Sequence, residues 1–174
     1  DYLPYKVIAV ESAEADDIIA TLAHEAKLAN LPVTMVTDDK DVMGLIRDSS
    51  PKCQQWLYTK KEMMDATGVQ NKFGVTPSQM VDYLSLLGDT SDNVPGVKGV
   101  GAKSAMALLQ HFGTLESMYA SIADVAGLKI RGAASIQKKL ETDHETALQA
   151  KRLITLRNDV PIGKVVWSDL EYKG

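Results

Sequence analysis

The stretch LLGDTSDNVPGVKGVGAKSAMALLQHFG, residues 86–113, contains the two features that decide the fold. It begins with two carboxylates three residues apart, Asp89 and Asp92, and continues into a glycine-rich turn, Gly-Val-Lys-Gly-Val-Gly at 96–101. Apolar residues then recur at helical spacing over 102–111, and a glycine follows, which predicts a helix with a glycine C-cap.

The turn at 96–101 is typical of a helix-hairpin-helix, which binds a nucleic-acid backbone without reading its bases. Glycines allow close approach to the main chain, and the first N–H groups of a helix are free to bind an anion. We expect Val97, Val100 and Ala105 to form the buried side. Taken alone, the pattern also fits an ordinary turn before a capped helix. The predicted DNA contacts are Gly96, Lys98, Gly99, Gly101, Lys103 and Ser104.

Length and composition set wide limits. A chain of 174 residues, 45% of them hydrophobic, can form one large domain or two small ones with a real core. The single cysteine, Cys53, excludes a disulfide framework and a cysteine-rich zinc site. The sequence contains no apolar run long enough to span a membrane and no signal-peptide pattern, so we expect a protein without membrane partners.

Charge is unevenly distributed, although the formal net charge is only −4. Residues 11–47 carry eight acidic and three basic side chains, whereas residues 98–157 carry nine basic and five acidic ones. A metal site beside a phosphate-binding surface requires such an arrangement of charge. The distribution, more than the net charge, therefore favours a nucleic-acid partner.

Strand and helix patterns alternate in the first half of the chain, which predicts a parallel sheet. β-Branched apolar runs indicate strands at 5–10 and 33–37, with a third near 55–58. The predicted helices of this half cover 14–29, 42–46, 60–66 and 77–87.

The second half shows only helix patterns, followed by a last dozen residues that are irregular or form a stray strand. We therefore predict an α/β portion over residues 1–87 and a helical, DNA-binding portion over residues 88–174. The predicted helices of this half cover 102–111, 114–120, 130–142 and 143–157.

Acidic side chains gather at three places: the first turn of a helix after a strand, the end of the next strand, and the start of the 86–113 stretch. Neighbouring parallel strands end at the same sheet edge, so we expect the first two groups to converge. Singly, such acids are more often structural, as helix caps or first-turn residues. The three groups are Glu14, Asp16 and Asp17; Asp39 and Asp41; and Asp89 and Asp92.

Carboxylates converging without histidine or cysteine favour a hard cation, Mg²⁺ or Mn²⁺. Two such ions held by carboxylates are a recurrent device for phosphodiester hydrolysis, with one activating water and the other stabilising the leaving oxygen. We therefore expect a metal-dependent site that acts on nucleic acid.

Three motifs in order, Glu14-Ala15-Asp16-Asp17, Thr37-Asp38-Asp39-Lys40-Asp41 and Gly88-Asp89-Thr90-Ser91-Asp92-Asn93, precede the glycine-rich turn. Together they resemble the flap-endonuclease family, as found in the 5′-nuclease (5′–3′ exonuclease) domain of bacterial DNA polymerase I. The resemblance runs from about residue 7 to residue 162. Asp38 departs from it, because the family usually has a small residue at that position.

The resemblance implies a PIN-like, 5′-nuclease-like parallel sheet followed by a helix–three-turn–helix element on duplex DNA. It implies a structure-specific nuclease that uses two divalent ions during replication and repair. It further implies that all seven acids are metal ligands, with Asp39, Asp41, Asp89 and Asp92 in the catalytic role. Main-chain carbonyls of Val97 and Val100 are the implied sites for a monovalent cation, K⁺.

The implied partner is duplex DNA with a 5′ flap, a nick or an RNA primer, bound by a monomer in the bacterial cytoplasm at the nucleoid. Family members begin with further strands, which carry catalytic aspartates, and with a helical arch, and this sequence lacks a match to them. We therefore expect a fragment of a polymerase I or of a stand-alone 5′-nuclease, with an exposed apolar sheet edge and weak flap cleavage on its own.

Two alternatives remain open at this point. A non-catalytic duplex-DNA-binding module would keep the hairpin and carry a vestigial acidic site, and it would bind DNA equally well with chelator present. A receiver-like signalling domain could also use paired acids after a strand to bind one Mg²⁺, but it leaves residues 86–113 unexplained.

Overall fold

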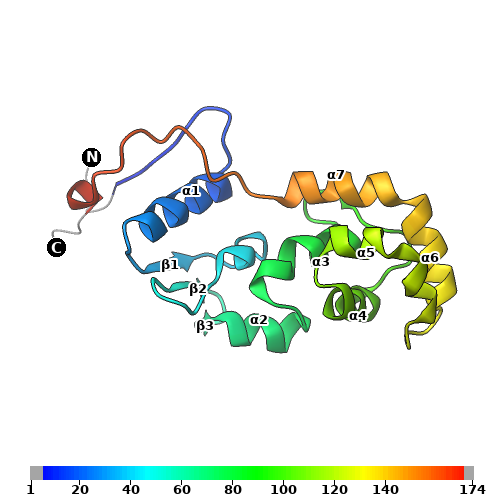
Figure 1. Cartoon of the computed structure of the whole chain (residues 1–174). Coiled ribbons are helices and arrows are strands. Elements are labelled where there is room, and N and C mark those ends of the chain that lie inside the picture. The colour runs from blue at the N-terminus through cyan, green and yellow to red at the C-terminus, as the bar shows by residue number, and fades with distance from the viewer. Residues whose placement is uncertain (1–5, 171–174) are drawn as a thin grey trace.

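The computed structural model describes residues 6–170, which run from a small sheet at one end to a group of helices at the other (Figure 1). The strands are β1 (Val33–Val36), β2 (Cys53–Leu57), β3 (Glu62–Met64), β4 (Gly88–Asp89) and β5 (Val94–Pro95). The α-helices are α1 (Ala15–Leu28), α2 (Ala66–Phe73), α3 (Met80–Leu87), α4 (Ala102–Phe112), α5 (Leu115–Ala120), α6 (Ala133–Thr142) and α7 (His144–Ile154). The 3₁₀ helices are η1 (Asp41–Leu45), η2 (Pro77–Gln79), η3 (Ile122–Gly127) and η4 (Trp167–Leu170).

The larger sheet has the order β1-β2-β3, with β1 parallel to β2 and β3 antiparallel to β2. Its inner face carries the buried side chains of Met35, Cys53 and Leu57, and α1 lies beside β1. The strand predictions at 33–37 and 55–58 and the parallel pairing are confirmed. Within the described residues β1 is an outer strand, and Val36 is 65% exposed, so the expected apolar sheet edge is present.

Three predictions for this half and its border are wrong. Residues 6–10 form no strand and Val7 is exposed, because no described strand lies beside them; Tyr5 lies outside the described residues. Residues 60–64 form the turn and second strand of the β2–β3 hairpin instead of a helix, because Trp56 pairs with Met63, and Ala66 is already the first residue of α2. The stretch after residue 88 is not purely helical, since β4 and β5 form a short antiparallel pair.

Local sequence signals set the ends of the helices. Asp65 caps α2 by accepting the N–H of Gly68 at 2.7 Å. The prediction of a helix at 60–66 did not use this N-cap residue, which places the helix start after residue 65. Thr76 and Gln79 form a capping box with Pro77 at the first helical position, so the predicted helix at 77–87 is observed as η2 followed by α3. The helices at 14–29, 102–111, 114–120, 130–142 and 143–157 are confirmed, apart from shifts of a few residues at their ends.

Two short segments differ in kind from their predictions. The turn after β1 is the 3₁₀ helix η1, and it buries Val42 as the predicted helix would. The C-terminal stretch contains the 3₁₀ helix η4, and residues 171–174 lie outside the described residues. No helix within residues 6–170 is long and apolar enough to cross a membrane.

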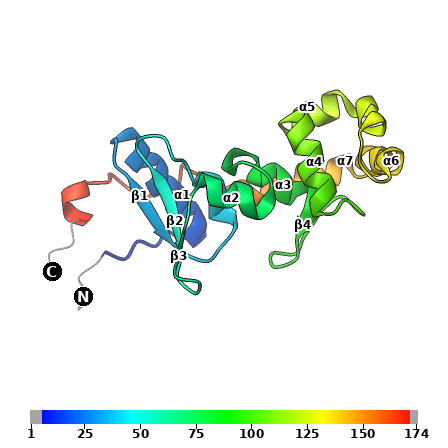
Figure 2. The ribbon, with the colours of Figure 1, turned by 90° about the horizontal axis from the view of Figure 1, so that it is seen from below.

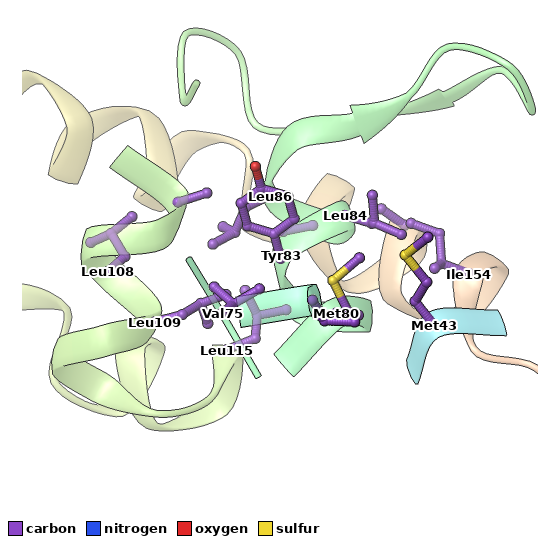
Figure 3. Packing of buried hydrophobic residues seen from close by; sticks show 14 of the residues in the cluster. Met43, Val75, Met80, Tyr83, Leu84, Leu86, Leu108, Leu109, Leu115 and Ile154 are labelled. Carbon is purple, nitrogen blue, oxygen red and sulfur yellow. The ribbon is translucent and has the colours of Figure 1, made fainter. Parts of the chain in front are cut away.

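Helix α3 is the centre of the core (Figure 3). Its buried side chains, among them Met80, Tyr83 and Leu86, contact the sheet side through Met43 of η1 and the helical side through Leu109 of α4. Its last residue is followed at once by Gly88 and Asp89. The buried cluster therefore positions the acidic residues that follow α3 against those of η1. The division of the chain at residues 87 and 88 stays a prediction.

An ion-pair network around the buried Asp82 joins three of the helices. The ammonium of Lys151 on α7 lies 2.6 Å from Asp82 Oδ1 on α3 and 2.6 Å from Glu116 Oε1 on α5. The other oxygen of Asp82 accepts the N–H of Leu115 at 3.0 Å. Asp82 is only 4% exposed, so its charge depends on these partners.

We predict that Lys151→Met destabilises the fold by about 3–5 kcal/mol, because it leaves the buried Asp82 carboxylate without its cation. Urea unfolding followed by circular dichroism measures this change. The matched control is Arg152→Met on the same helix, where an exposed side chain is replaced and a change within about 0.5 kcal/mol is expected. Equal effects of the two substitutions would contradict the role of the network.

Candidate functional site

Three carboxylates meet at the junction between the sheet and the helices. Asp41, Asp89 and Asp92 each offer one oxygen, and these oxygens lie within 4.8 Å of one another. Asp41 is the first residue of η1, Asp89 belongs to β4, and Asp92 lies in the turn between β4 and β5. The group therefore combines acids separated by almost fifty residues of sequence. We call these three residues the acidic cluster.

The loop from β1 to η1 is held in place by Gln55, a fully buried side chain of β2. Its amide nitrogen donates to the carbonyls of Thr37 at 2.9 Å and of Asp39 at 2.6 Å. Asp39 Oδ1 then accepts the N–H of Asp41 at 3.0 Å. Sequence reasoning missed Gln55, although an amide between the inward-facing Cys53 and Leu57 is the signal that could have found it.

Burial and neighbouring negative charges raise the pKa values of two acids in this region. Burial, followed by the nearby charges of Asp39 and Asp89, raises the pKa of Asp41 to about 6. Burial also raises the pKa of Asp16, and the charge of Asp39 adds to this effect. Asp16 and Asp39 are therefore near neighbours of the cluster, although their oxygens are not among the three that lie within 4.8 Å.

Asp89 is the exception, because it has a cation of its own. Burial alone would raise its pKa, but the Lys40 ammonium at 2.7 Å from Oδ2 and the N–H of Ser91 hold the pKa below its usual range. The carboxylate is 2% exposed. Sequence reasoning did not include Lys40 in the site.

Glu14 and Asp17 are not among the three acids of the cluster, although their charges also help to raise the pKa of Asp16. Asp17 Oδ1 accepts the main-chain N–H of Arg157 at 2.8 Å, so this carboxylate fastens the C-terminal stretch to α1. Glu14 is the N-cap residue of α1 and makes no side-chain cap hydrogen bond. The structure thus brings together three of the seven predicted acids, keeps Asp16 and Asp39 close, and gives Asp17 a structural contact.

The cluster suits a hard divalent cation. All its donors are carboxylate oxygens, the ligands that Mg²⁺ and Mn²⁺ prefer. Asp41 Oδ1 is buried and has no hydrogen-bond donor among the described residues. Buried oxygens without donors carry a desolvation cost that a bound cation would offset.

The glycine-rich turn at 96–101 follows β5 in the chain, and its glycines differ in conformation and surroundings. Gly96 lies so close to the main chain of Leu87 and Gly88 that a side chain would collide there, so it fixes β5 against the end of α3. Gly99 has φ +80, which favours glycine. Gly101 is the N-cap of α4 with φ −99, and a Cβ there would meet nothing within 4 Å. Gly101 is therefore free of strain and open to an incoming molecule.

The buried side of the turn is as predicted. Val97, Val100 and Ala105 are 2%, 5% and 0% exposed. The N–H of Val100 donates to the carbonyl of Val97 at 3.0 Å, so that carbonyl already has a partner. Helix α4 follows α3 in the helical half of the molecule (Figure 2). Lys103 is exposed in the first turn of α4, at the helix start where N–H groups are free.

Helix α6 supports the turn from the other side, a contact that sequence reasoning missed. Asp143, just after α6, accepts the N–H of Lys98 at 2.9 Å, so this N–H is not free for a phosphate. The end of the Lys139 side chain lies where a Cβ on Gly99 would be. Lys98, Lys138 and Lys139 line one shallow pocket together. The basic surface therefore extends from the turn onto α6.

Comparisons with known proteins agree with both halves of this arrangement. A family model described as the N-terminal resolvase-like domain of 5′–3′ exonuclease matches residues 1–74. A second, described as the C-terminal SAM fold of 5′–3′ exonuclease, matches residues 75–174.

The relatives include a DNA polymerase I of Pseudomonas aeruginosa, 41% identical over 90% of this chain and 17% of that protein. The flap endonuclease Xni of Cronobacter sakazakii is 37% identical over 88% of this chain and 57% of that protein. This chain thus spans less than two thirds of each of these two relatives.

A solved structure of a flap endonuclease from bacteriophage T5, in complex with DNA and metal ions, has the same fold. The TM-score is 0.70, at 20% identity, over 83% of this chain and 50% of that one. The fold prediction is confirmed. The two family models together cover the whole chain, and the chain therefore belongs to the 5′–3′ exonuclease family.

Proposed function

We propose that this chain is part of a structure-specific 5′-nuclease that hydrolyses DNA phosphodiesters with two divalent ions, Mg²⁺ or Mn²⁺. The observation that carries the proposal is the position of the acidic cluster. Asp89 and Asp92 lie between α3 and the glycine-rich turn, so the predicted metal ligands and the predicted DNA grip belong to one continuous segment. Relatives named as flap endonuclease and DNA polymerase I support this reading.

Each group of residues has a proposed task. Asp41, Asp89 and Asp92 hold a first ion, and Asp39 and Asp16 extend the site towards a second. Glu14 and Asp17 complete the proposed ligand set; Asp17 Oδ1 accepts the N–H of Arg157, which leaves its Oδ2 for an ion. Bound divalent ions supply an activated water and stabilise the leaving oxygen.

The turn and α4 hold the duplex by its backbone. The free N–H groups at the start of α4 and the exposed Lys103 face a phosphate, and Ser104 lies in the same first turn. Gly99 and Gly101 allow the backbone of the DNA to approach, and the side chain of Lys98 adds charge. The carbonyl of Val100, with that of Val97 if its hydrogen bond opens, is the proposed K⁺ position.

The proposed substrate is duplex DNA with a 5′ flap, a nick or an RNA primer, bound by a monomer in the bacterial cytoplasm at the nucleoid. A non-catalytic DNA-binding module is the competing function. The two differ in whether a divalent ion binds and whether DNA is cut. Both properties can be measured on the same protein with the same variants.

The metal site is tested by titrating Mn²⁺ into the protein by calorimetry. Asp41→Asn and Asp92→Asn should each weaken binding by about ten-fold or more, because each removes an oxygen of the cluster. Asp124→Asn is the matched control, since Asp124 is an exposed acid on η3. Unchanged affinity in both cluster variants would remove the metal-site proposal. Slow release of a 5′ flap that chelator and Asp92→Asn both abolish would support the nuclease over the binding module.

A pH effect should follow from the pKa of Asp41, which is about 6 in the folded protein and ordinary in the unfolded chain. The folded state binds this proton more tightly, so ionisation costs stability as the pH rises from about 4 to 6. In chelator, Asp41→Asn should raise the melting temperature at pH 7.5 by about 2 °C or more, with no gain at pH 4. Thermal scans at the two pH values measure this, and a gain at pH 4 as large as at pH 7.5 would contradict it.

The DNA grip is tested by fluorescence anisotropy on a flap duplex and on a duplex of unrelated sequence over a series of salt concentrations. Lys103→Ala should lower affinity equally for both and reduce the magnitude of the log–log salt slope by about one. Gly101→Val should weaken binding more, because the valine side chain fills the open space where the backbone of the DNA approaches. The substitution does not strain the fold, because a Cβ at this position meets nothing within 4 Å and φ is −99.

Matched controls exist for both variants. Gly127→Val makes the same replacement in an equally open place on η3, and Lys60→Ala removes an exposed lysine beside the β2–β3 turn. Neither should change binding. Failure of the unmodified protein to bind either duplex at low salt would rule out the hairpin assignment.

A further inference from the structure

Lys40 has an unusual position among the acids of the site. Its ammonium lies 2.7 Å from Asp89 Oδ2, and that oxygen is one of the most enclosed in the acidic cluster, because Asp89 is only 2% exposed. The side chain of Lys40 itself is 32% exposed. A single protein cation therefore neutralises the most buried charge of the cluster from its solvent side.

The main chain and the side chain of Lys40 differ in how firmly they are held. On either side of Lys40, hydrogen bonds from Gln55 to the Asp39 carbonyl and from Asp41 N–H to Asp39 Oδ1 fix the loop. The lysine side chain has a flexible four-carbon stem, and its only ion pair among the described residues is with Asp89. The ammonium can therefore leave Asp89 without moving the loop that carries it.

The chemistry of the cluster favours such a departure. A divalent cation carries twice the charge of the ammonium and can contact Asp41, Asp89 and Asp92 at once, whereas within residues 6–170 the ammonium pairs with Asp89 alone. A cation bound to Asp89 Oδ2 would repel the ammonium that lies 2.7 Å from the same oxygen, because two positive charges would then share one carboxylate. Lys40 and a divalent cation are thus alternative partners of one carboxylate.

We propose that Lys40 is a tethered counter-ion of the acidic cluster, which it occupies in the absence of a divalent cation and yields on exchange with one. The inference rests on the proposed metal site and adds a competitor to it. Paired with Asp89, the ammonium keeps the buried carboxylate ionised and the fold intact without metal. Released, it places a positive charge at the rim of the site, within reach of an anion such as a phosphate.

The test compares the unmodified protein with Lys40→Met, which keeps an unbranched side chain, one heavy atom shorter, and removes its charge. In chelator, Lys40→Met should lower the melting temperature by about 5 °C or more, because Asp89 loses its partner. Mn²⁺ should bind Lys40→Met at least about five-fold more tightly by calorimetry, because its competitor is gone. At saturating Mn²⁺ the difference in melting temperature should close. Lys52→Met, which replaces an exposed lysine away from the cluster, should leave all three quantities unchanged.

The possible results separate this inference from the proposed function. Equal Mn²⁺ affinities of the unmodified protein and Lys40→Met, or a loss of melting temperature that persists in Mn²⁺, would overturn the exchange and leave the metal site standing. Absence of Mn²⁺ binding in both proteins would overturn the metal site and the exchange together. Binding by Lys40→Met alone would support the exchange, with Lys40 as the stronger competitor.

Discussion

The burial of a charged carboxylate, Asp89, is the constraint on which the rest of this structure depends. A carboxylate that is 2% exposed is tolerated only with a compensating cation and hydrogen bonds. Lys40 and the N–H of Ser91 provide these contacts. Their positions require the loop after β1 to meet the end of α3. Gln55 fixes that loop, and the close approach of Gly96 to the end of α3 fixes the other side.

The same constraint links the site to the helical half. Asp89 follows the C-terminal end of α3 by two residues, and α3 is buried between the sheet side and α4. The core that holds α3 therefore also holds the acidic cluster. Beyond the cluster the chain enters the turn at 96–101 with no intervening element other than β5. A DNA backbone bound at the start of α4 would therefore lie a few residues along the chain from the carboxylates. This continuity would let one segment serve both the proposed DNA binding and the proposed chemistry.

The sequence predicted the helices around this segment because their signals are local. Pro77, the capping residue Thr76 and the apolar spacing of 102–111 set their positions without help from distant residues. The failures depend on contacts between distant residues. The turn and strand at 60–64 follow from the pairing of β3 with β2, and the apolar run at 6–10 forms no strand because no described strand pairs with it.

The site divides in the same way. Asp41, Asp89 and Asp92 could be predicted because acids after strands and before a glycine-rich turn form recognisable motifs. Three other contacts join residues that are remote in sequence. They are the hydrogen bond from Arg157 N–H to Asp17, the hydrogen bonds of the Gln55 amide, and the ion pair between Lys40 and Asp89. No local pattern specifies such contacts. The hydrogen bond from Lys98 to Asp143 belongs to the same class.

The proposed divalent-cation site and its occupation by Lys40 in the cation's absence can be tested together by anomalous diffraction from crystals of the protein soaked in Mn²⁺. We expect an anomalous peak among the oxygens of Asp41, Asp89 and Asp92, with the Lys40 ammonium moved away from Asp89 Oδ2. A cluster without a peak, and with Lys40 still paired to Asp89 at high Mn²⁺ concentration, would contradict both proposals.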